Sequence, residues 1–273
     1  MKNNFYRLDS QNGVLIYKNK LLERYDFVNH AFSTRIGGVS KNAYSSLNLG
    51  VNTDDEKCAV LNNFKLFAEA MCTDISKMVL SHQVHSANIR TVTKADCGKG
   101  ILKDSDIKEV DGLVTCDMGV TLSTFYADCT PVLMLDTKNR VVASVHSGWR
   151  GTVSKIVQKA VFKMRDEFNS NPSDIICVTG PSIKQCHFEV GEEVFLEFKT
   201  VFGDIAEKST ARKNKKYYID TDALNVNSLL EAGILKENID ICPLCTFCNN
   251  DIFFSHRGDG GKTGRMCASI ELK

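Results

Sequence analysis

Apolar residues along the chain fall into short runs and helical stripes. Runs bounded by glycine, asparagine or aspartate are typical of strands. They cover residues 13–17, 87–93, 120–126, 132–135, 141–145, 175–179, 252–255 and 266–272. The number of such runs predicts that sheets make up much of the fold.

Four other segments repeat their apolar positions about every 3.6 residues, which predicts helices. The clearest is 153–168, and the others are 62–71, 191–202 and 221–232. Asp220 is expected to cap the last of these helices, and Gly233 to end it. Because the strands are mixed with separated helices and no strict βαβ alternation appears, the pattern predicts an α+β fold in one domain, 1–273.

Composition and charge exclude several classes of function. Of the 273 residues, 43% are hydrophobic and 25% are charged, as in an average globular protein rather than a disordered one. A net charge of +1 gives no global attraction to nucleic acid or anionic lipid, and no apolar run approaches the about 20 residues of a membrane helix. We therefore expect no nucleic-acid partner and no membrane partner, and no obligate protein partner is evident. The basic run 208–216 is expected to be a solvated loop.

The chain is rich in cysteine. Its 11 cysteines are an odd number, so they cannot all pair within the chain. Since the first residues contain no apolar signal-peptide core, we expect a cytoplasmic protein with reduced thiols. Cys242, Cys245 and Cys248 have the spacing of metal ligands but no fourth ligand at a matching spacing, so we expect them to be unliganded thiols.

A predicted hairpin brings together a thiol and an imidazole. Two apolar runs flank the polar turn at 136–140, which is typical of two antiparallel strands. A loop centred on residues 137 and 138 would place Cys129 directly opposite His146, although a longer loop would shift the register by a residue or two. The two side chains would then be close enough to share a metal ion or a proton.

Several chemistries fit this pair. With a second histidine, it would form a zinc site that leaves a coordination position open, and His82 and His85 are equal candidates from their spacing. Without a metal, Cys129 could be a nucleophile and His146 its base. Two histidines and a cysteine also bind blue copper.

The strand that ends at His146 leads through a glycine-rich turn into the predicted helix. Backbone N–H groups at such a turn, together with the planar donors of Arg150, suit a phosphate or carboxylate. The stretch 260–263 looks like the end of a phosphate loop, but His256 stands where its first glycine belongs, so it is not one. Arg257 and Arg265 flank this late loop.

Taken together, these segments resemble the laccase-domain family. Eight motifs occur in the family's order: FSTRIGGVS at 32–40, LNLG at 47–50, QVH at 83–85, DGLVT at 111–115, ADCTPV at 127–132, HSGWRG at 146–151, GPSI at 180–183 and TGRM at 263–266. The family was formerly described as multicopper polyphenol oxidoreductases. It is now understood as zinc-dependent purine nucleoside phosphorylases with accompanying adenosine deaminase activity.

The resemblance carries expectations for this chain. It implies mixed and antiparallel sheets covered by helices, and it selects His85 as the third ligand. It thereby carries the catalytic and metal-binding roles to His85, Cys129 and His146, with zinc as the expected ion and copper as the alternative. The implied substrates are phosphate and a purine nucleoside, such as adenosine, inosine or methylthioadenosine.

Four residues are expected to bind these substrates. Arg35 and Arg150 are the candidates for phosphate, and Asn48 and Asp128 for sugar or base. The chain departs from the family where Ser182 replaces a frequent cysteine and where Gly258 follows Arg257 in place of a second arginine. Both departures bear on substrate preference.

The sequence leaves three alternative functions open. The first is an amidase-like hydrolase that edits a peptidoglycan precursor. The second is a copper-dependent polyphenol oxidoreductase, for which six histidines are too few to build the further copper centres. The third is a structural zinc protein or partner-binding module without catalysis.

Overall fold

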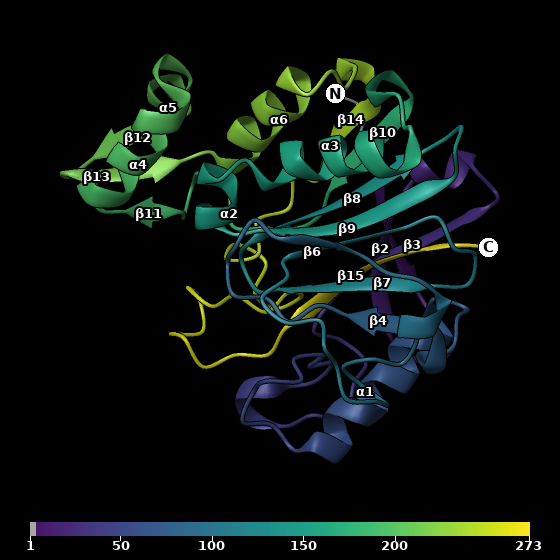
Figure 1. Ribbon diagram of the computed structural model, residues 1–273. Coiled ribbons are helices and arrows are strands. Elements are labelled where there is room, and N and C mark those ends of the chain that lie inside the picture. Colours follow the sequence, from purple (N-terminus) through teal and green to yellow (C-terminus); the bar gives the residue numbers. More distant parts are fainter. Residues whose placement is uncertain (1–3) are drawn as a thin grey trace.

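Two six-stranded sheets lie one above the other in the centre of the computed structural model, which describes residues 4–273 (Figure 1). In spatial order, the first sheet contains β1 (Phe5–Asp9), β2 (Leu15–Asn19), β3 (Val28–Ser33), β15 (Met266–Leu272), β7 (Thr121–Tyr126) and β4 (Met78–Leu80). The second contains β14 (Ile239–Ile241), β10 (Ile175–Thr179), β8 (Thr130–Asp136), β9 (Val141–Ser147), β6 (Gly112–Thr115) and β5 (Ile89–Thr91). Both sheets are mixed, because β4 pairs with β7, β5 with β6 and β10 with β14 in parallel and the other pairs are antiparallel.

Helices cover the outer faces of these sheets. The helices are α1 (Lys57–Ala70), α2 (Trp149–Val153), α3 (Ile156–Phe168), α4 (Glu192–Phe202), α5 (Asp204–Lys208) and α6 (Thr221–Glu231). Helices α3 and α6 lie over the second sheet, and α1 lies against the first (Figure 1). Short 3-10 turns occur at Leu22–Arg24, Asn42–Tyr44, Ile75–Lys77, Lys94–Asp96, Pro172–Asp174 and Lys236–Asn238. The chain therefore folds into a single α+β domain, as predicted.

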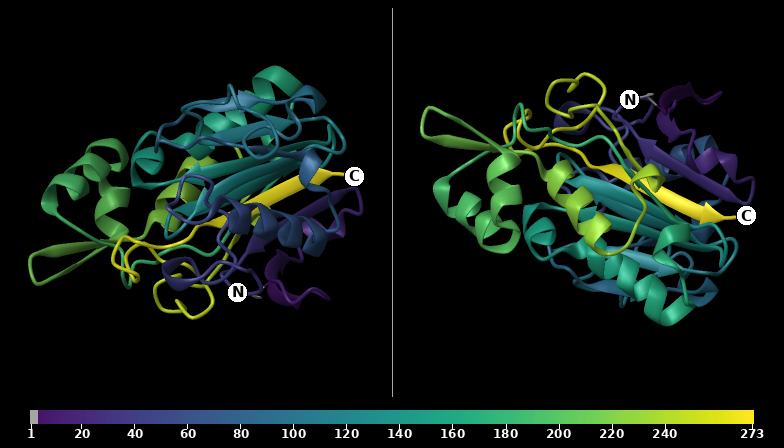
Figure 2. Two further views of the ribbon diagram at one scale, coloured as in Figure 1. Left: turned by 90° about the horizontal axis from the view of Figure 1, so that it is seen from below. Right: turned by 90° about the horizontal axis from the view of Figure 1, so that it is seen from above.

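A small third sheet extends the molecule at one end. It consists of β11 (Glu189–Val190), β13 (Lys216–Ile219) and β12 (Thr210–Lys213), and it packs with α4 and α5 (Figure 2). Phe195, Phe198 and Phe202 of α4 are half of the six buried residues of a separate apolar cluster, which Trp149 of α2 joins from the main body. The small sheet is thereby attached beside the start of α2.

The central strands are apolar on both faces because both faces are covered. On β8, Leu133 and Leu135 contribute to the core between the sheets, whereas Val132 and Met134 belong to the cluster under α3. Alternate residues of a strand point to opposite faces, so a strand covered on both sides reads as a continuous apolar run. All residues of β8 and β9 are buried.

Most predicted elements are present with slightly different ends. The predicted strands 13–17, 87–93, 120–126, 132–135, 141–145, 175–179 and 266–272 correspond to β2, β5, β7, β8, β9, β10 and β15. Helices α1, α4 and α6 confirm three predicted helices. Asp220 caps α6 by accepting a hydrogen bond from the Ala223 N–H at 3.0 Å, and Gly233 follows the helix with a φ of +95°.

The predicted helix 153–168 is confirmed over 156–168 as α3. It begins later than predicted because Lys155, with a φ of +53°, separates it from α2.

Two predicted elements are wrong. Residues 252–255 form no strand; they are apolar because Phe253 and Phe254 are buried between the two sheets. The basic run 208–216, expected to be a loop, forms most of the exposed β12–β13 hairpin.

The β8–β9 hairpin forms as predicted, but in another register. Asp136 pairs with Val141 around a four-residue loop, so His146 lies opposite Pro131 rather than opposite Cys129. The side chain of Asp136 accepts hydrogen bonds from two N–H groups of that loop, at 2.8 and 3.0 Å. A shift of two residues keeps Cys129 on the same face as before, because side chains alternate with a period of two.

None of the helices found between residues 4 and 273 has the length and apolar character that crossing a membrane requires.

Candidate active site

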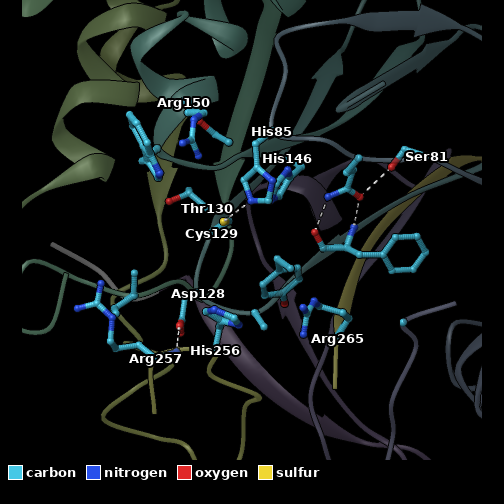
Figure 3. Close-up of a pocket in the computed structure, with 18 of the residues that line it drawn as sticks. Ser81, His85, Asp128, Cys129, Thr130, His146, Arg150, His256, Arg257 and Arg265 are labelled. Atoms are coloured by element: carbon cyan, nitrogen blue, oxygen red, sulfur yellow. Dashed lines mark hydrogen bonds between the residues drawn. The ribbon is translucent and has the colours of Figure 1, made fainter. Parts of the chain in front are cut away.

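The donor atoms of His85, Cys129 and His146 converge at one end of β8 and β9. These atoms lie within 4.8 Å of one another, and Cys129 Sγ is 3.7 Å from His85 Nε2 (Figure 3). His146 is buried, Cys129 half-buried and His85 exposed, so the group opens on one side. Two imidazoles and a thiolate are established zinc ligands, and three protein ligands leave a fourth position free. The cluster is a candidate metal site.

His82 is not part of this group. Its Nδ1 accepts a hydrogen bond from the Glu109 N–H at 3.4 Å, and its carbonyl accepts one from the Val110 N–H at 2.9 Å. The folded chain thus separates two histidines that their spacing could not distinguish.

Asp111 holds both histidines in place, a role that its position in the sequence did not predict. Its carboxylate is 2.8 Å from His146 Nδ1, which turns Nε2 of that ring toward Cys129. The same carboxylate accepts the N–H groups of Val84, His85 and Ser86 at 3.1, 3.0 and 2.8 Å, and these bonds hold the turn in which His85 has a φ of +62°. A carboxylate behind a ligating histidine orients the ring and raises its basicity.

Gly148 leaves room for the His85 and Cys129 side chains. A Cβ on this residue would lie 2.6 Å from His85 Cδ2 and 3.3 Å from Cys129 Sγ. Its φ of −70° is open to any residue, so the requirement for glycine is steric. The backbone approaches the ligand cluster as closely as it can, which fits a site built to hold an ion.

The thiol and the buried imidazole shift each other's pKa. Burial alone would raise the pKa of Cys129, but His146 and His85 outweigh it and lower that pKa to about 6. Burial alone would lower the pKa of His146, but Cys129 and Asp111 raise it to about 9. Cys129 is therefore a thiolate at neutral pH, the form in which cysteine binds metals.

The cluster lies in a cavity of about 490 Å³, a volume typical of small-molecule sites. Distant segments of the chain line it: residues 50–53, 81, 83, 85, 125–130, 146, 147, 149, 150, 183, 188, 221, 256, 257 and 265. Arg150, Arg257 and Arg265 bring positive charge to its wall, around the Cys129 side chain (Figure 3). A cavity with a donor cluster and several arginines can hold an anion beside a metal ion.

Two of the four predicted substrate residues line this cavity. Arg150 does, with its guanidinium stacked 4.2 Å over the Trp149 ring. Asp128 also does, but both of its carboxylate oxygens accept protein hydrogen bonds, from the Thr246 hydroxyl at 2.6 Å and from the Arg257 N–H at 2.7 Å. Asp128 has a φ of +89°, a conformation uncommon outside glycine, immediately before Cys129.

The other two lie outside the cavity wall. Arg35 donates to the carbonyls of Ser45 and Asn250, at 3.0 and 2.7 Å. Asn48 is fully buried, and its Oδ1 accepts the N–H groups of Gly50 and Arg265, both at 2.9 Å. Asn48 therefore connects two segments of the cavity wall.

Further residues of the site carry no assignment from the sequence. Arg257 and Arg265 were noted only as the edges of the late glycine-rich loop, although Arg265 falls within the TGRM motif. Gln83, which lines the cavity, accepts the Phe125 N–H at 2.6 Å and donates to the Phe125 carbonyl at 2.7 Å. The QVH motif was the available signal for Gln83.

The family profile described as multi-copper polyphenol oxidoreductase laccase matches residues 29–273. The chain belongs to this laccase-domain family. Purine nucleoside phosphorylase YlmD of Bacillus subtilis (strain 168) is 36% identical over 245 residues, which are 89% of this chain and 87% of that protein. Adenosine deaminase RL5 of an unknown prokaryotic organism is 33% identical over 92% of this chain and 99% of that protein.

Solved laccase-domain structures share the whole fold. The crystal structure of the hypothetical protein YfiH of Bacillus licheniformis superposes with a TM-score of 0.91 at 33% identity, covering 98% of this chain and 99% of that one. This laccase-domain chain is thus an enzyme homologue of purine nucleoside phosphorylases and of an adenosine deaminase, and it carries a candidate metal site.

Proposed function

We propose that this chain is a zinc-dependent purine nucleoside phosphorylase that also deaminates adenosine. The observation that carries the proposal is the presence, in one cavity, of an open His85–Cys129–His146 donor set and of arginines suited to phosphate. Relatives named for these two activities support it, since each aligns with most of the chain. Adenosine, inosine and methylthioadenosine are the proposed nucleosides.

In phosphorolysis, a phosphate oxygen bonds to C1′ of the ribose, the bond from C1′ to the purine nitrogen breaks, and the purine takes up a proton. Arg150 is the first candidate to bind the phosphate, because its guanidinium is exposed in the cavity and held flat against Trp149. Arg257 and Arg265 extend the positive wall, and Asp128 positions the backbone of Arg257. Arg35 and Asn48 act in this proposal as positioning residues behind the wall.

His85, Cys129 and His146 would hold the zinc ion. When bound there, zinc would supply Lewis-acid polarisation to the substrate. Asp111 holds Nδ1 of His146, which leaves the other ring nitrogen free to bind the ion, and Gly148 has no side chain to crowd His85 and Cys129. His85 presents its ring from the exposed side, where a substrate enters.

Zinc suits these residues better than copper does. A blue-copper site adds a weak axial side-chain ligand, most often methionine and in some sites glutamine, to its two histidines and cysteine. Among the described residues that line the cavity, none is methionine, and Gln83 is engaged by the backbone of Phe125. The remaining histidines also cannot supply further copper centres around this one.

Nucleoside assays on protein of known metal content test the proposal. Zinc-loaded protein should release purine from inosine or adenosine only when phosphate is present, and should convert adenosine to inosine without it. Failure of both reactions in zinc-loaded protein would reject the proposal. Phosphate-independent release of an amino acid from a peptidoglycan precursor would favour the editing hydrolase instead.

Replacing Arg150 tests the phosphate site. Loss of a charge-assisted hydrogen bond removes about 1.5–3 kcal/mol, so Arg150→Ala should raise the KM for phosphate about 10–100-fold. Arg150→Lys should recover part of this loss, and adenosine deamination should be nearly unchanged. Arg165→Ala is the matched control, because Arg165 is also exposed and stacks on an aromatic ring, but on α3 outside the cavity.

A further inference from the structure

A second group of cysteine and histidine side chains with the arrangement of metal ligands lies outside the cavity. Cys186, His187, Cys245 and Cys248 have one donor atom each, and these atoms all lie within 4.8 Å of one another. None of the four lines the cavity that contains the His85 cluster. Cys186 and His187 precede β11, whereas Cys245 and Cys248 follow β14, so the group joins segments about 60 residues apart in sequence.

The spacing of these atoms matches a tetrahedral zinc site. Zn–S bonds of about 2.3 Å and Zn–N bonds of about 2.0–2.1 Å place two sulfur atoms about 3.8 Å apart, and nitrogen and sulfur about 3.6 Å apart. Cys186 Sγ and Cys248 Sγ are 3.7 Å apart. His187 Nδ1 is 3.2 Å from Cys186 Sγ, 3.3 Å from Cys248 Sγ and 4.0 Å from Cys245 Sγ.

The surroundings orient the donors. The His187 ring stacks on Phe247 with a centroid distance of 4.0 Å, which holds the imidazole while its Nδ1 faces the sulfur atoms. The Lys184 N–H points at Cys245 Sγ from 3.5 Å, as a hydrogen bond to a thiolate does. Cys242, the remaining cysteine of this run, is fully buried between the sheets, and its burial raises its pKa to about 12, so it stays a protonated core residue.

We propose that Cys186, His187, Cys245 and Cys248 bind a structural zinc ion. Four protein ligands would complete the coordination of the ion, as in structural zinc sites, whereas the His85 cluster has three ligands and leaves one position open. On binding, the three thiols release their protons to solvent, and the ion takes the place of those protons between the sulfur atoms. The proposal stands whether or not the proposed activity is correct.

The ion would stabilise the wall of the catalytic cavity, because the segments that bind it are hydrogen-bonded to residues of that wall. The two segments already exchange backbone hydrogen bonds, from the Ser182 N–H to Leu244 O at 3.3 Å and from the Thr246 N–H to Ser182 O at 3.1 Å. Thr246 also donates to Asp128, which directly precedes Cys129. The Arg257 guanidinium in turn donates to Glu189 O at 3.0 Å, just past His187. A zinc ion between residues 186–187 and 245–248 would therefore hold together the segments that carry Glu189, Arg257 and Asp128.

Metal analysis of matched variants tests the proposal. The unmodified protein should hold about two zinc ions per chain, one in each site. Cys129→Ser and Cys248→Ser should each hold one, and the double variant none. Cys116→Ser is the control, since Cys116 is exposed and belongs to neither cluster, and it should hold both ions. A Cys248→Ser variant with undiminished zinc would overturn the proposal.

If Cys248→Ser fails to fold, the absorption spectrum of bound cobalt provides a second test of the site. In Cys129→Ser loaded with Co²⁺, the second site should show an intense thiolate-to-cobalt charge-transfer band and a tetrahedral ligand field. Absence of that band would count against the site. So would a Cys186–Cys248 disulfide in place of metal, found by mass spectrometry in protein purified without a reductant.

Discussion

At the scale of single residues, close approach of the backbone to the His85 cluster makes Gly148 critical. An added Cβ would lie 2.6 Å from His85 Cδ2, well inside normal contact. Gly148→Ala should therefore displace the His85 ring, lower zinc content at this site and abolish most activity, while the circular dichroism spectrum stays native. Gly151→Ala is the control, because a Cβ there would be no closer than 3.4 Å to any neighbour. Equal losses in the two variants would contradict this steric account.

His30 gives the protein a dependence of stability on pH. Burial, with smaller contributions from Lys18 and Lys273, lowers its pKa from 6.5 to about 3, and its Nε2 accepts the Asn19 N–H at 2.8 Å. Between these two pKa values His30 is protonated in the unfolded chain but neutral in the folded one. The contribution of His30 to the free energy of unfolding is therefore complete above about pH 6.5 and is lost as the pH falls toward 3. The free energy of unfolding falls by up to about 1.4 kcal/mol for each pH unit in this range.

Urea unfolding across this pH range measures the effect. His30→Gln removes the titrating group, so its free energy of unfolding should fall less steeply between pH 6.5 and 4 than that of the unmodified protein. The slopes are compared, rather than the absolute stabilities, because the substitution also changes packing in β3. Parallel curves would show that His30 does not titrate as its burial requires.

At the scale of elements, the β12–β13 hairpin turns through two residues with positive φ. Asn214 and Lys215 have φ values of +50° and +60°, the geometry of a type I′ turn, in which Asn-Gly is preferred. Lys215→Gly should remove the left-handed strain of a side chain, and raise stability by about 1 kcal/mol. Lys215→Ala, which keeps a Cβ, should change it little. A Tm increase confined to the glycine variant would support the assignment, and a decrease in that variant would refute it.

Elements whose pattern is local could be predicted from the sequence. The β8–β9 hairpin, β10, β15 and α6 all formed where the apolar runs, the cap at Asp220 and the glycine at 233 placed them. The predicted register of the β8–β9 hairpin was wrong by two residues. The Asp136 side chain accepts hydrogen bonds from the N–H groups of a longer loop, and residue type alone does not specify this contact.

Elements that depend on tertiary contacts escaped prediction. β3 contains Asn29 and His30, which are polar but buried among other strands, so its pattern did not stand out. Residues 252–255 looked like a strand because two phenylalanines fill the core, and burial gives a loop the same composition as a strand. The break at Lys155 likewise lies inside an uninterrupted apolar stripe.

In the candidate site too, residues linked by a local pattern were predicted and residues brought together only by the fold were not. Cys129 and His146 followed from one hairpin, and the family's motifs selected His85. Asp111 reaches them from the start of β6, and Cys186 lies about 60 residues from Cys245, so no spacing rule joins these residues. The sequence therefore predicted unliganded thiols at Cys245 and Cys248, whereas the fold places both beside Cys186 and His187.

At the scale of the whole molecule, the cavity lies where the main body meets the small sheet. Trp149 is part of its wall and also joins the apolar cluster of α4, with its ring 6.5 Å from that of Phe198. The Arg150 guanidinium also lies over the Trp149 ring, 4.2 Å from its centroid. The packing of the small sheet thus determines where the proposed phosphate-binding guanidinium is held.

Two alanine substitutions of buried phenylalanines distinguish an effect on the position of Arg150 from a general loss of stability. Phe198 in α4 and Phe67 in α1 are both fully buried, so Phe198→Ala and Phe67→Ala should each destabilise the protein by about 3–5 kcal/mol. Only Phe198→Ala removes the support of Trp149, and it should raise the KM for phosphate at a temperature where both variants are still folded. Phe67 packs under the first sheet, is not part of the cavity wall and does not belong to the cluster that includes Trp149, so its variant should keep the KM of the unmodified protein. If both truncations raise KM equally, the effect is one of general stability, and the small sheet has no particular part in holding Arg150.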